Sequence, residues 1–182
     1  MSYAELDRLA AEAPAGAQGV IFSPYLAGER CPHWDPRLRG SFVGLDLVHG
    51  PSHAARAVLE GVSFSIRDAL SALPSPIAND VPFKVVGGGA SSPVWLAILT
   101  AVLRRSLVPL PQADSSYGAA LIALAAVNGS DTETVCRTGS AGGEVVTPDR
   151  LWSAVYDDAF EVYRAIHRQL SEVYHRPQEQ PA

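Results

Sequence analysis

Apolar residues recur along the chain at two spacings, and these spacings predict strands that alternate with helices. A repeat of three and four residues is typical of one helix face and predicts helices over residues 3–12, 51–73, 93–105, 118–127 and 148–174. Short apolar or alternating runs are typical of strands and predict strands over residues 19–24, 41–48, 82–86 and 107–110. Because strands and helices alternate, we expect an α/β domain with a mostly parallel or mixed sheet.

Two of the predicted helices carry an expectation about burial. The helix over residues 118–127 is rich in alanine and has almost no polar face, so it should be buried. In the helix over residues 51–73, Arg56, Glu60 and Arg67 stand at turn spacing. We expect these three side chains to form solvent-facing pairs, each of which stabilises a helix by only some tenths of a kcal/mol.

The composition is that of a folded protein with one core. The chain has 182 residues, of which 47% are hydrophobic and 18% charged. No repeat or linker divides it, so we expect a single domain over residues 1–182 with a frayed tail over residues 176–182. Asp and Glu number 19 against 14 Lys and Arg, and the resulting net charge of −5 argues against general nucleic-acid binding.

The chain lacks the sequence marks of a membrane or secreted protein. No apolar run approaches the about 20 residues of a membrane span, and residues 1–10 are too polar for the core of a signal peptide. Cys31 and Cys136 are too few for a disulfide framework. We therefore expect a cytoplasmic protein with reduced thiols.

Lysine chemistry is nearly excluded, because Lys84 is the single lysine of the chain. No glycine-rich loop ends in Gly-Lys-Ser or Gly-Lys-Thr, which excludes a P-loop nucleotide hydrolase. A Schiff-base mechanism would have to depend on Lys84 alone.

The most informative stretch is a glycine-rich turn that follows the strand over residues 82–86. Gly87, Gly88 and Gly89 let a ligand approach the backbone with no Cβ in the way. The next helix should point its first amides and positive dipole end back at this turn, which suits a phosphate or the edge of a nucleotide. A dinucleotide fingerprint is not complete, because Ser92 stands where its last glycine would be. Geometry alone leaves a second interpretation open, a tight turn without a ligand.

A metal site is disfavoured by the spacing of the candidate ligands. His49 and His53 are four residues apart, and Cys31 and His33 are close to them in sequence. Gly50-Pro51 breaks the helix that a His-x-x-x-His pair needs, and the spacings do not match a structural zinc site. We therefore expect no metal ligands here.

Five motifs in order carry a family resemblance. They are Gly28-Glu-Arg-x-Pro-His-Trp-Asp-Pro, Gly44-Leu, Arg56-Ala-Val-Leu-Glu-Gly, Gly87-Gly-Gly-Ala-Ser-Ser-Pro-x-Trp and Tyr117-Gly-Ala-Ala-Leu-Ile-Ala. Over roughly residues 3–128 this series resembles the C-terminal domain of the FGGY family of carbohydrate kinases, which includes xylulokinase, gluconokinase and glycerol kinase. The first motif looks more like the xylulokinase and gluconokinase side of the family.

The resemblance implies a fold, a reaction and a site. The implied fold is ribonuclease-H-like (actin-like ATPase), with a mixed sheet flanked by helices, and the implied reaction is transfer of a phosphoryl group from ATP to a sugar hydroxyl with Mg²⁺. The implied nucleotide-binding residues are Gly87, Gly88, Gly89, Ala90, Ser91, Ser92 and Pro93.

The resemblance also places one loop near the cleft between the two domains of such kinases. Glu29 and Arg30 lie in this loop, so Arg30 would face the substrate or the other domain. The alternative is that Glu29 and Arg30 pair locally and order an irregular loop.

The chain departs from the family at its start. Family C-terminal domains begin with strands and a second phosphate loop before the helix that Tyr3–Ala11 matches, so we expect a fold that is incomplete at its N-terminal end. No Asp matches the catalytic base of the family: Asp35 is expected in a turn, Asp46 on a strand and Asp68 on a helix flank.

Two functional hypotheses follow. The first is the ATP-binding or ADP-binding portion of a sugar kinase, which takes a sugar only together with the missing N-terminal domain and is inactive alone. The second is a non-catalytic interaction module that self-associates or docks with a separate N-terminal partner, because missing strands would leave an open sheet edge. An unrelated α/β nucleotide-binding domain is a third alternative.

Overall fold

The structure, a computed structural model, describes residues 2–74, 81–110, 113–139 and 143–175. In chain order its elements are α1 (Tyr3–Glu12), η1 (Ala17–Gly19), β1 (Ile21–Ser23), β2 (Ser41–Val43), α2 (Pro51–Ser71), β3 (Phe83–Val86), η2 (Gly88–Ser91), α3 (Pro93–Leu103), β4 (Leu107–Leu110), α4 (Ser115–Asn128), α5 (Thr132–Gly139) and α6 (Arg150–His175). The predicted frayed tail and most of the connection that follows α2 lie outside the described residues.

The five predicted helices are confirmed, with ends that differ by a turn or less. Pro51 and Pro93 begin α2 and α3, where proline fits because the first helical amide has no acceptor. Arg104 ends α3 with a left-handed backbone, φ 52°. One helix was not predicted: α5 is a short element whose first turn is capped by the Asp131 carboxylate, which accepts the Thr134 N–H at 2.8 Å.

The strands form two separate pairs in the described part of the chain, not the single mixed sheet expected. Antiparallel β1 and β2 form one pair, and parallel β3 and β4 form the other. The strand predicted over residues 41–48 ends at Val43. It ends there because Gly44 has φ +89° and lies so close to Gly19 that a Cβ would be 2.6 Å from the Gly19 carbonyl oxygen.

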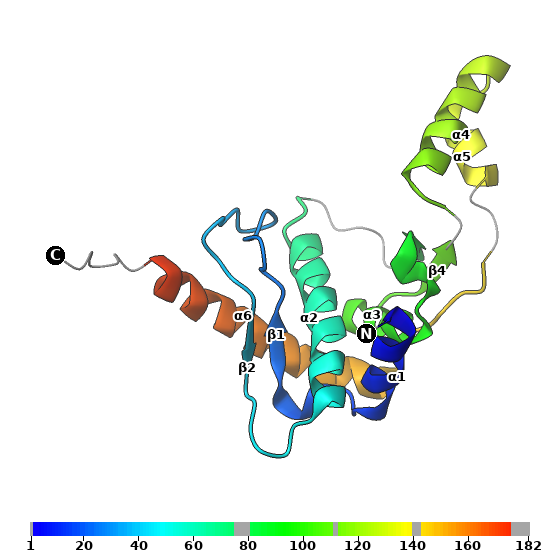
Figure 1. Ribbon diagram of the computed structural model, residues 1–182. Helices are drawn as coiled ribbons and strands as arrows, with labels where there is room; N and C mark the ends of the chain where they lie inside the picture. The colour runs from blue at the N-terminus through cyan, green and yellow to red at the C-terminus, as the bar shows by residue number, and fades with distance from the viewer. Residues whose placement is uncertain (1, 75–80, 111–112, 140–142, 176–182) are drawn as a thin grey trace.

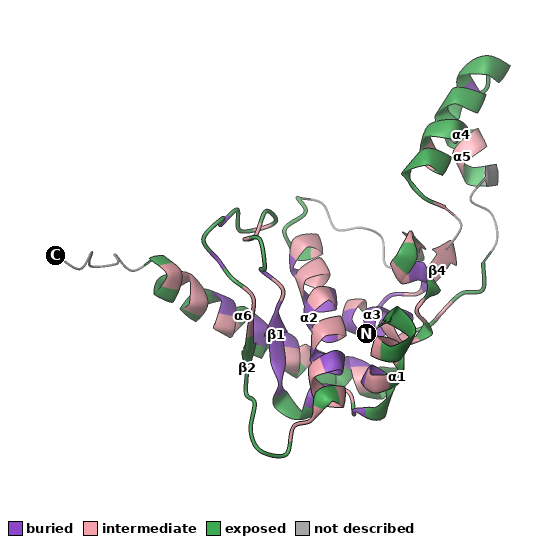
Figure 2. Cartoon of the chain, viewed as in Figure 1, coloured by how far each residue is buried: buried purple, intermediate pink, exposed green. Residues whose placement is uncertain are grey.

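The core lies where α2, α3 and α6 meet β1 (Figures 1 and 2). Its largest fully buried apolar or aromatic side chains are Tyr25, Tyr156, Tyr163, Phe64, Leu38 and Ile98. The backbones of α2 and β1 approach closely, since a Cβ on Gly61 would be 2.2 Å from the Phe22 carbonyl oxygen.

The prediction that Arg56 and Glu60 face solvent is wrong, because both residues are 1% exposed. Glu60 Oε1 accepts hydrogen bonds from Arg56 Nε at 2.8 Å, the Tyr156 hydroxyl at 2.8 Å and the Gly16 N–H at 2.9 Å. Burial raises the pKa of Glu60, whereas Arg56 acts in the opposite direction. The i,i+4 spacing predicts the Arg56–Glu60 ion pair correctly, but spacing does not show which face of the helix other elements cover.

Arg67 is half-buried and pairs across elements, with its guanidinium 2.9 Å from the Asp157 carboxylate of α6. Its guanidinium carbon also lies 4.4 Å from the centre of the Phe160 ring. The expected solvent-facing pair within α2 is therefore replaced by a contact between α2 and α6.

The prediction that the alanine-rich helix is buried is also wrong. Of the residues of α4, only Ala125 is buried. Helix α4 packs against α5, and the two project away from the rest of the molecule (Figures 1 and 2). An apolar sequence shows that burial would be favourable, but it does not supply the surface that covers the helix.

Among the described residues, no helix is both long enough and apolar enough to cross a membrane.

Two Arg–Glu pairs at the same i,i+4 spacing allow a matched test of burial. We expect Arg56→Met to lower the free energy of unfolding by about 3–5 kcal/mol, because it leaves the buried Glu60 carboxylate without its cation. The control Arg8→Met removes an exposed pair with Glu12 and should cost less than about 1 kcal/mol. Urea unfolding followed by circular dichroism measures both.

The double variant Arg56→Met/Glu60→Leu checks the cause. It removes both charges, so we expect it to recover much of the stability that Arg56→Met loses. Equal small losses for Arg56→Met and Arg8→Met would contradict the buried pair.

Candidate functional site

The glycine-rich turn begins where β3 ends. Gly87 has φ +78°, a conformation that favours glycine, and its N–H donates to the Ala113 carbonyl at 3.0 Å. A 3₁₀ turn over Gly88–Ser91 follows and leads into α3. The turn therefore lies at the carboxyl end of a parallel strand, which is where ligands bind in open α/β sheets.

The seven candidate nucleotide-binding residues fall into two groups. A Cβ on Gly87 or Gly88 would meet nothing within 4 Å, so this part of the backbone is open to a ligand. A Cβ on Gly89 would lie 2.3 Å from Trp95 Cζ3, and Ala90 is 4% exposed. Gly89 and Ala90 therefore let the turn pack against α3, and the exposed Ser91 lies beside the open glycines.

Ser92 caps the start of α3, and Pro93 is the first residue of this helix. The Ser92 hydroxyl oxygen accepts the Trp95 N–H at 3.0 Å, and the Ser92 N–H donates to the Gly89 carbonyl at 3.1 Å. Pro93 has no N–H, so Val94 is left as the one first-turn amide that could serve a ligand. The expected set of several free amides at this helix end is not present among the described residues.

Asp7 was missed by sequence reasoning, and it changes the electrostatics of the site. Its carboxylate accepts a hydrogen bond from the Ser92 hydroxyl at 2.8 Å, so a negative charge of α1 already lies at the positive end of α3. A phosphate at this end would be repelled by Asp7. No local signal could reveal this contact, because 85 positions separate the two residues.

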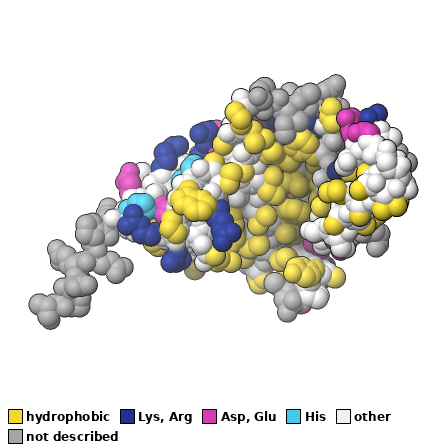
Figure 3. Space-filling view, turned by 90° about the horizontal axis from the view of Figure 1, so that it is seen from above, with side chains coloured by type: hydrophobic (Ala, Val, Ile, Leu, Met, Phe, Trp, Pro, Cys, Tyr) yellow, Lys and Arg dark blue, Asp and Glu magenta, His cyan; other side chains and the backbone are white. Residues whose placement is uncertain are grey.

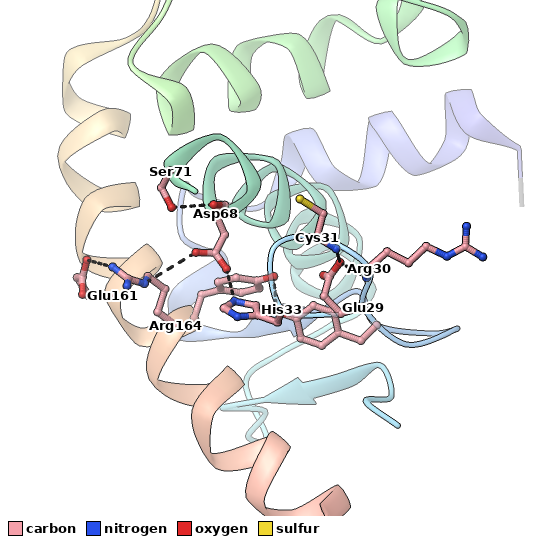
Figure 4. Close-up of polar contacts among 10 residues, drawn as sticks. Glu29, Arg30, Cys31, His33, Asp68, Ser71, Glu161 and Arg164 are labelled. Carbon is pink, nitrogen blue, oxygen red and sulfur yellow. Dashed lines mark hydrogen bonds and ion pairs between the residues drawn. The ribbon is translucent and has the colours of Figure 1, made fainter. Parts of the chain in front are cut away.

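The loop with Glu29 and Arg30 is ordered through its backbone. Glu29 and Asp35 exchange two backbone hydrogen bonds of 2.8 Å each. The Glu29 carboxylate accepts the N–H groups of Arg30 and Cys31 at 2.7 and 2.9 Å. Glu29 thus orders the loop through the Arg30 amide, while the exposed Arg30 guanidinium extends away from the cluster (Figure 4).

The same loop is attached to α2 and α6 by two His–Asp contacts. His33 Nε2 lies 2.7 Å from the buried Asp68 carboxylate of α2, and Asp35 lies 2.8 Å from His175 of α6. The hydrogen bond with His175 lowers the pKa of Asp35. Asp35 also accepts the Arg37 N–H at 3.0 Å, which confirms its predicted turn role.

Asp46 lies in a turn, not on the strand where it was predicted. Its carboxylate accepts the Val48 N–H at 2.8 Å and lies 3.0 Å from His49. Each Asp considered as a catalytic base therefore has structural hydrogen-bond or ion-pair partners.

His167 of α6 lies against the loop that contains Glu29 and His33. In the described part of the chain, its Nε2 atom is buried and has no polar partner. Its ring stacks on His33 with centroids 3.8 Å apart and meets the edge of Tyr25 at 5.5 Å. Burial lowers the pKa of His167, and the neighbouring His33 lowers it further, whereas Asp68, Glu29 and Asp35 raise it. The folded loop therefore favours neutral His167.

The histidines considered for zinc have other contacts. His49 Nδ1 accepts the Asp46 N–H at 2.9 Å, and His53 Nδ1 accepts the Gly50 N–H at 3.1 Å. Within residues 2–74, 81–110, 113–139 and 143–175, no three His, Cys, Asp or Glu side chains form a group that could bind a metal ion.

The contacts of His167 predict how stability depends on pH. Because the pKa of His167 is lowered from 6.5, the unfolded chain binds the proton more readily than the folded chain. We expect the free energy of unfolding to fall below pH 6.5 by up to about 1.4 kcal/mol per pH unit more than in His167→Phe. Urea unfolding at three pH values between 7.5 and 5.5 gives both slopes.

His53→Gln is the control, because Gln at this position can still accept the Gly50 N–H. It should keep the pH dependence of the wild type. A His167→Phe slope equal to that of the wild type would contradict the assignment to His167.

The sequence of this chain matches a family of known proteins. The profile of the FGGY family of carbohydrate kinases, C-terminal domain, matches residues 2–127. The xylulose kinase of Staphylococcus epidermidis is 33% identical over 174 residues, which cover 94% of this chain and 35% of that protein. The gluconokinase of Bacillus subtilis is 36% identical over 132 residues, 71% of this chain and 26% of that protein.

Solved structures agree in fold. The ligand-bound xylulose kinase from Lactobacillus acidophilus superposes with a TM-score of 0.85 at 31% identity, over 95% of this chain and 36% of that chain. Gluconate kinase from the same organism superposes with a TM-score of 0.84 at 31% identity, over 95% of this chain and 35% of that chain. Glycerol kinase from Plasmodium falciparum is similar in fold, with a TM-score of 0.71 at 19% identity. The superposition covers 97% of this chain and 35% of that chain.

These similarities confirm both the resemblance and the actin-like ATPase fold. The chain spans about a third of the length of the relatives it matches, 35% in the case of the S. epidermidis enzyme. The chain belongs to the FGGY family of carbohydrate kinases, and the part of the family that it matches is the C-terminal domain.

Proposed function

We propose that this chain is the nucleotide-binding part of a sugar kinase, and that it binds the adenine and ribose of ATP or ADP. The observation that carries the proposal is the open backbone of Gly87 and Gly88 at the carboxyl end of β3. Backbone N–H and C=O groups can recognise the edge of a base, and glycine lets the ring approach them closely. The exposed Ser91 hydroxyl can contribute a hydrogen bond at the rim.

The electrostatics favour the uncharged part of the nucleotide at this turn. Asp7 lies at the start of α3, and the Ser92 cap and Pro93 leave Val94 as the amide available there. A phosphate bound here would meet a carboxylate and few donors. We therefore assign Gly87, Gly88 and Ser91 to the base and ribose, and Gly89, Ala90, Ser92 and Pro93 to the support of the turn.

The transfer step needs groups that these residues do not supply. Phosphoryl transfer depends on a positioned base and on neutralisation of charge at the γ-phosphate. Asp35, Asp46 and Asp68 have structural contacts, and the described residues offer no metal-binding group of three side chains. In kinases Mg²⁺ is held mainly by the nucleotide phosphates, by waters and by one or two carboxylates, and we assign no residue of this chain to it. We propose that the chain alone does not catalyse the reaction.

The acceptor of the complete enzyme is proposed from the relatives. The S. epidermidis and B. subtilis relatives, 33% and 36% identical to this chain, are named xylulose kinase and gluconokinase, so we infer that the acceptor is a sugar or a sugar acid. Arg30, whose exposed guanidinium extends from an ordered loop, is the side chain of this chain that we assign to contact with the acceptor or with the rest of the kinase.

Binding at the turn can be tested with Gly88→Val. The new side chain enters open space, so we expect ATP affinity to fall at least tenfold, about 1.4 kcal/mol, in isothermal titration calorimetry. Gly50→Val, also in open space at the start of α2, is the matched control and should bind like the wild type. Gly89→Val is unsuitable because it would collide with Trp95.

The ligand series tests which part of the nucleotide is bound. Adenosine should bind about as tightly as ATP, and inorganic triphosphate should not compete with it. Equal heats for wild type and Gly88→Val, or displacement of adenosine by triphosphate, would overturn the assignment.

Inactivity of the chain alone has its own test. With ATP, Mg²⁺ and D-xylulose or D-gluconate, we expect the chain to form ADP no faster than a reaction without the sugar. The complete S. epidermidis xylulose kinase with D-xylulose serves as the positive control. Sugar-dependent ADP formation by this chain would show that it holds a base that the structure does not reveal.

A further inference from the structure

The loop over residues 26–37 is held to the molecule by its two ends and by a few polar contacts. In this stretch, all of which the structure describes, no helix or strand lies between β1 and β2. Tyr25 and Leu38, which flank the loop, are 1% and 0% exposed and belong to the core. Between them, only Asp35 is buried. A segment with so little buried apolar surface opens locally at a lower cost than the core does.

Three histidines lie between the 26–37 loop and the helices next to it. His33 of the loop lies 2.7 Å from Asp68 of α2. His175 of α6 lies 2.8 Å from Asp35 of the loop. The third, His167 of α6, stacks on the His33 ring and is only 9% exposed. Figure 3 shows histidine side chains beside acidic and basic side chains at the end of the molecule where α6 ends.

A proton on His167 is poorly accommodated while the loop is in place. The neutral imidazole carries a hydrogen on one ring nitrogen, whereas the protonated ring carries a hydrogen on both. The Nε2 atom of His167 is buried and has no polar partner among the described residues, so its N–H would be left without an acceptor. Burying a charge without a hydrogen-bond partner is costly. Protonation of His167 is therefore favoured only where the ring can reach water.

The titratable groups around His167 leave this cost in place. They come from every element packed against it: Tyr25, Glu29, His33 and Asp35 of the loop and its flank, Asp68 of α2, and Tyr163, Arg164 and Arg168 of α6. Asp68 is shared by His33 and by Arg164, whose Nε lies 3.9 Å away. Burial and His33 outweigh the three carboxylates, so the pKa of His167 is lowered.

The other two histidines act in the opposite direction, but weakly. A protonated His33 attracts Asp68, and a protonated His175 attracts Asp35, more strongly than the neutral rings do. Both pairs already lie within hydrogen-bond distance, and the two histidine side chains are 36% and 38% exposed. The additional gain is small at such exposure. The buried ring of His167 therefore decides the direction of the pH response.

We propose that the 26–37 loop is an acid-released cover of α6, and that uptake of a proton by His167 detaches the loop and moves the His33 ring away. The charged His167 ring then reaches water. Helix α6 stays in place, because Tyr156, Phe160 and Tyr163 hold it in the core. The release is independent of the proposed function, although the loop that moves carries Arg30.

Hydrogen exchange followed by NMR tests the release at single amides. The reporters are Glu29 and Asp35, whose N–H groups donate to each other's carbonyl at 2.8 Å. Two such hydrogen bonds give little protection in a detached loop. Because the pKa of His167 in an open loop is about 6.5, opening should become up to about tenfold more frequent at pH 5.5 than at pH 7.5. The protection factors of both amides, corrected for the intrinsic pH dependence of exchange, should fall by this factor.

Low concentrations of urea separate release of the loop from unfolding of the whole chain. Local opening exposes little surface, so urea below the unfolding transition should barely change the protection of the Glu29 and Asp35 amides. The core amides of Ile98 and Val102 exchange through global unfolding. Their protection should be higher than that of the loop amides and should fall as urea is added.

Three variants identify the group that takes the proton. His167→Phe keeps an aromatic ring against His33 but binds no proton, so protection of the loop should not fall between pH 7.5 and 5.5. His33→Phe keeps a ring over His167 but loses the contact with Asp68, so it should lower protection at both pH values and keep the pH response. His53→Gln is the control outside this cluster and should behave like the wild type. Circular dichroism confirms that each variant is folded.

Four results would overturn the proposal. They are loop protection that does not change with pH in the wild type, an equal fall in His167→Phe, loss of the pH response in His33→Phe, and loop amides with the same protection and urea dependence as the core amides. The third would assign the proton to His33, and the fourth would show global unfolding. None of these measurements involves a nucleotide, so failure here is distinct from failure of the nucleotide site.

Discussion

The buried ion pair between Arg56 and Glu60 is the contact on which the arrangement of the helices depends. Glu60 receives hydrogen bonds from α2, from α6 through Tyr156 and from the turn after α1 through Gly16. Arg56 also lies 4.4 Å from the centre of the Trp152 ring of α6. Removing one member of a buried charge pair is strongly destabilising, because the other charge is left without compensation. Glu60 Oε1 makes all three of these hydrogen bonds, whereas the buried Oε2 atom has no partner among the described residues. The pair therefore connects α1, the turn after it, α2 and α6 through side chains of a single buried cluster.

This arrangement determines the chemistry of the glycine turn. Because α1 is held beside α3, Asp7 reaches Ser92 and places a carboxylate where a phosphate would otherwise bind. The turn then offers backbone groups and open space but little positive charge. Under the function proposed above, such a turn would recognise a base by hydrogen bonding and shape, and charge neutralisation would come from groups elsewhere.

The same arrangement leaves apolar surface uncovered. Ile66 and Leu70 of α2 face a groove, and α4 projects with one buried residue. Both features have one physical cause. An apolar face stabilises the fold only when another surface covers it and removes it from water.

The sequence by itself determined the five helices it predicted, the glycine turn after β3 and the family, because periodicity and short motifs are local properties. It also determined that Asp35 acts in a turn. Only the tertiary structure decided that Arg56 and Glu60 are buried, that α4 is exposed, that the strands form two pairs and that Asp7 reaches Ser92. Burial and long-range contacts depend on which surfaces meet, and residues 85 positions apart carry no local signal of their contact.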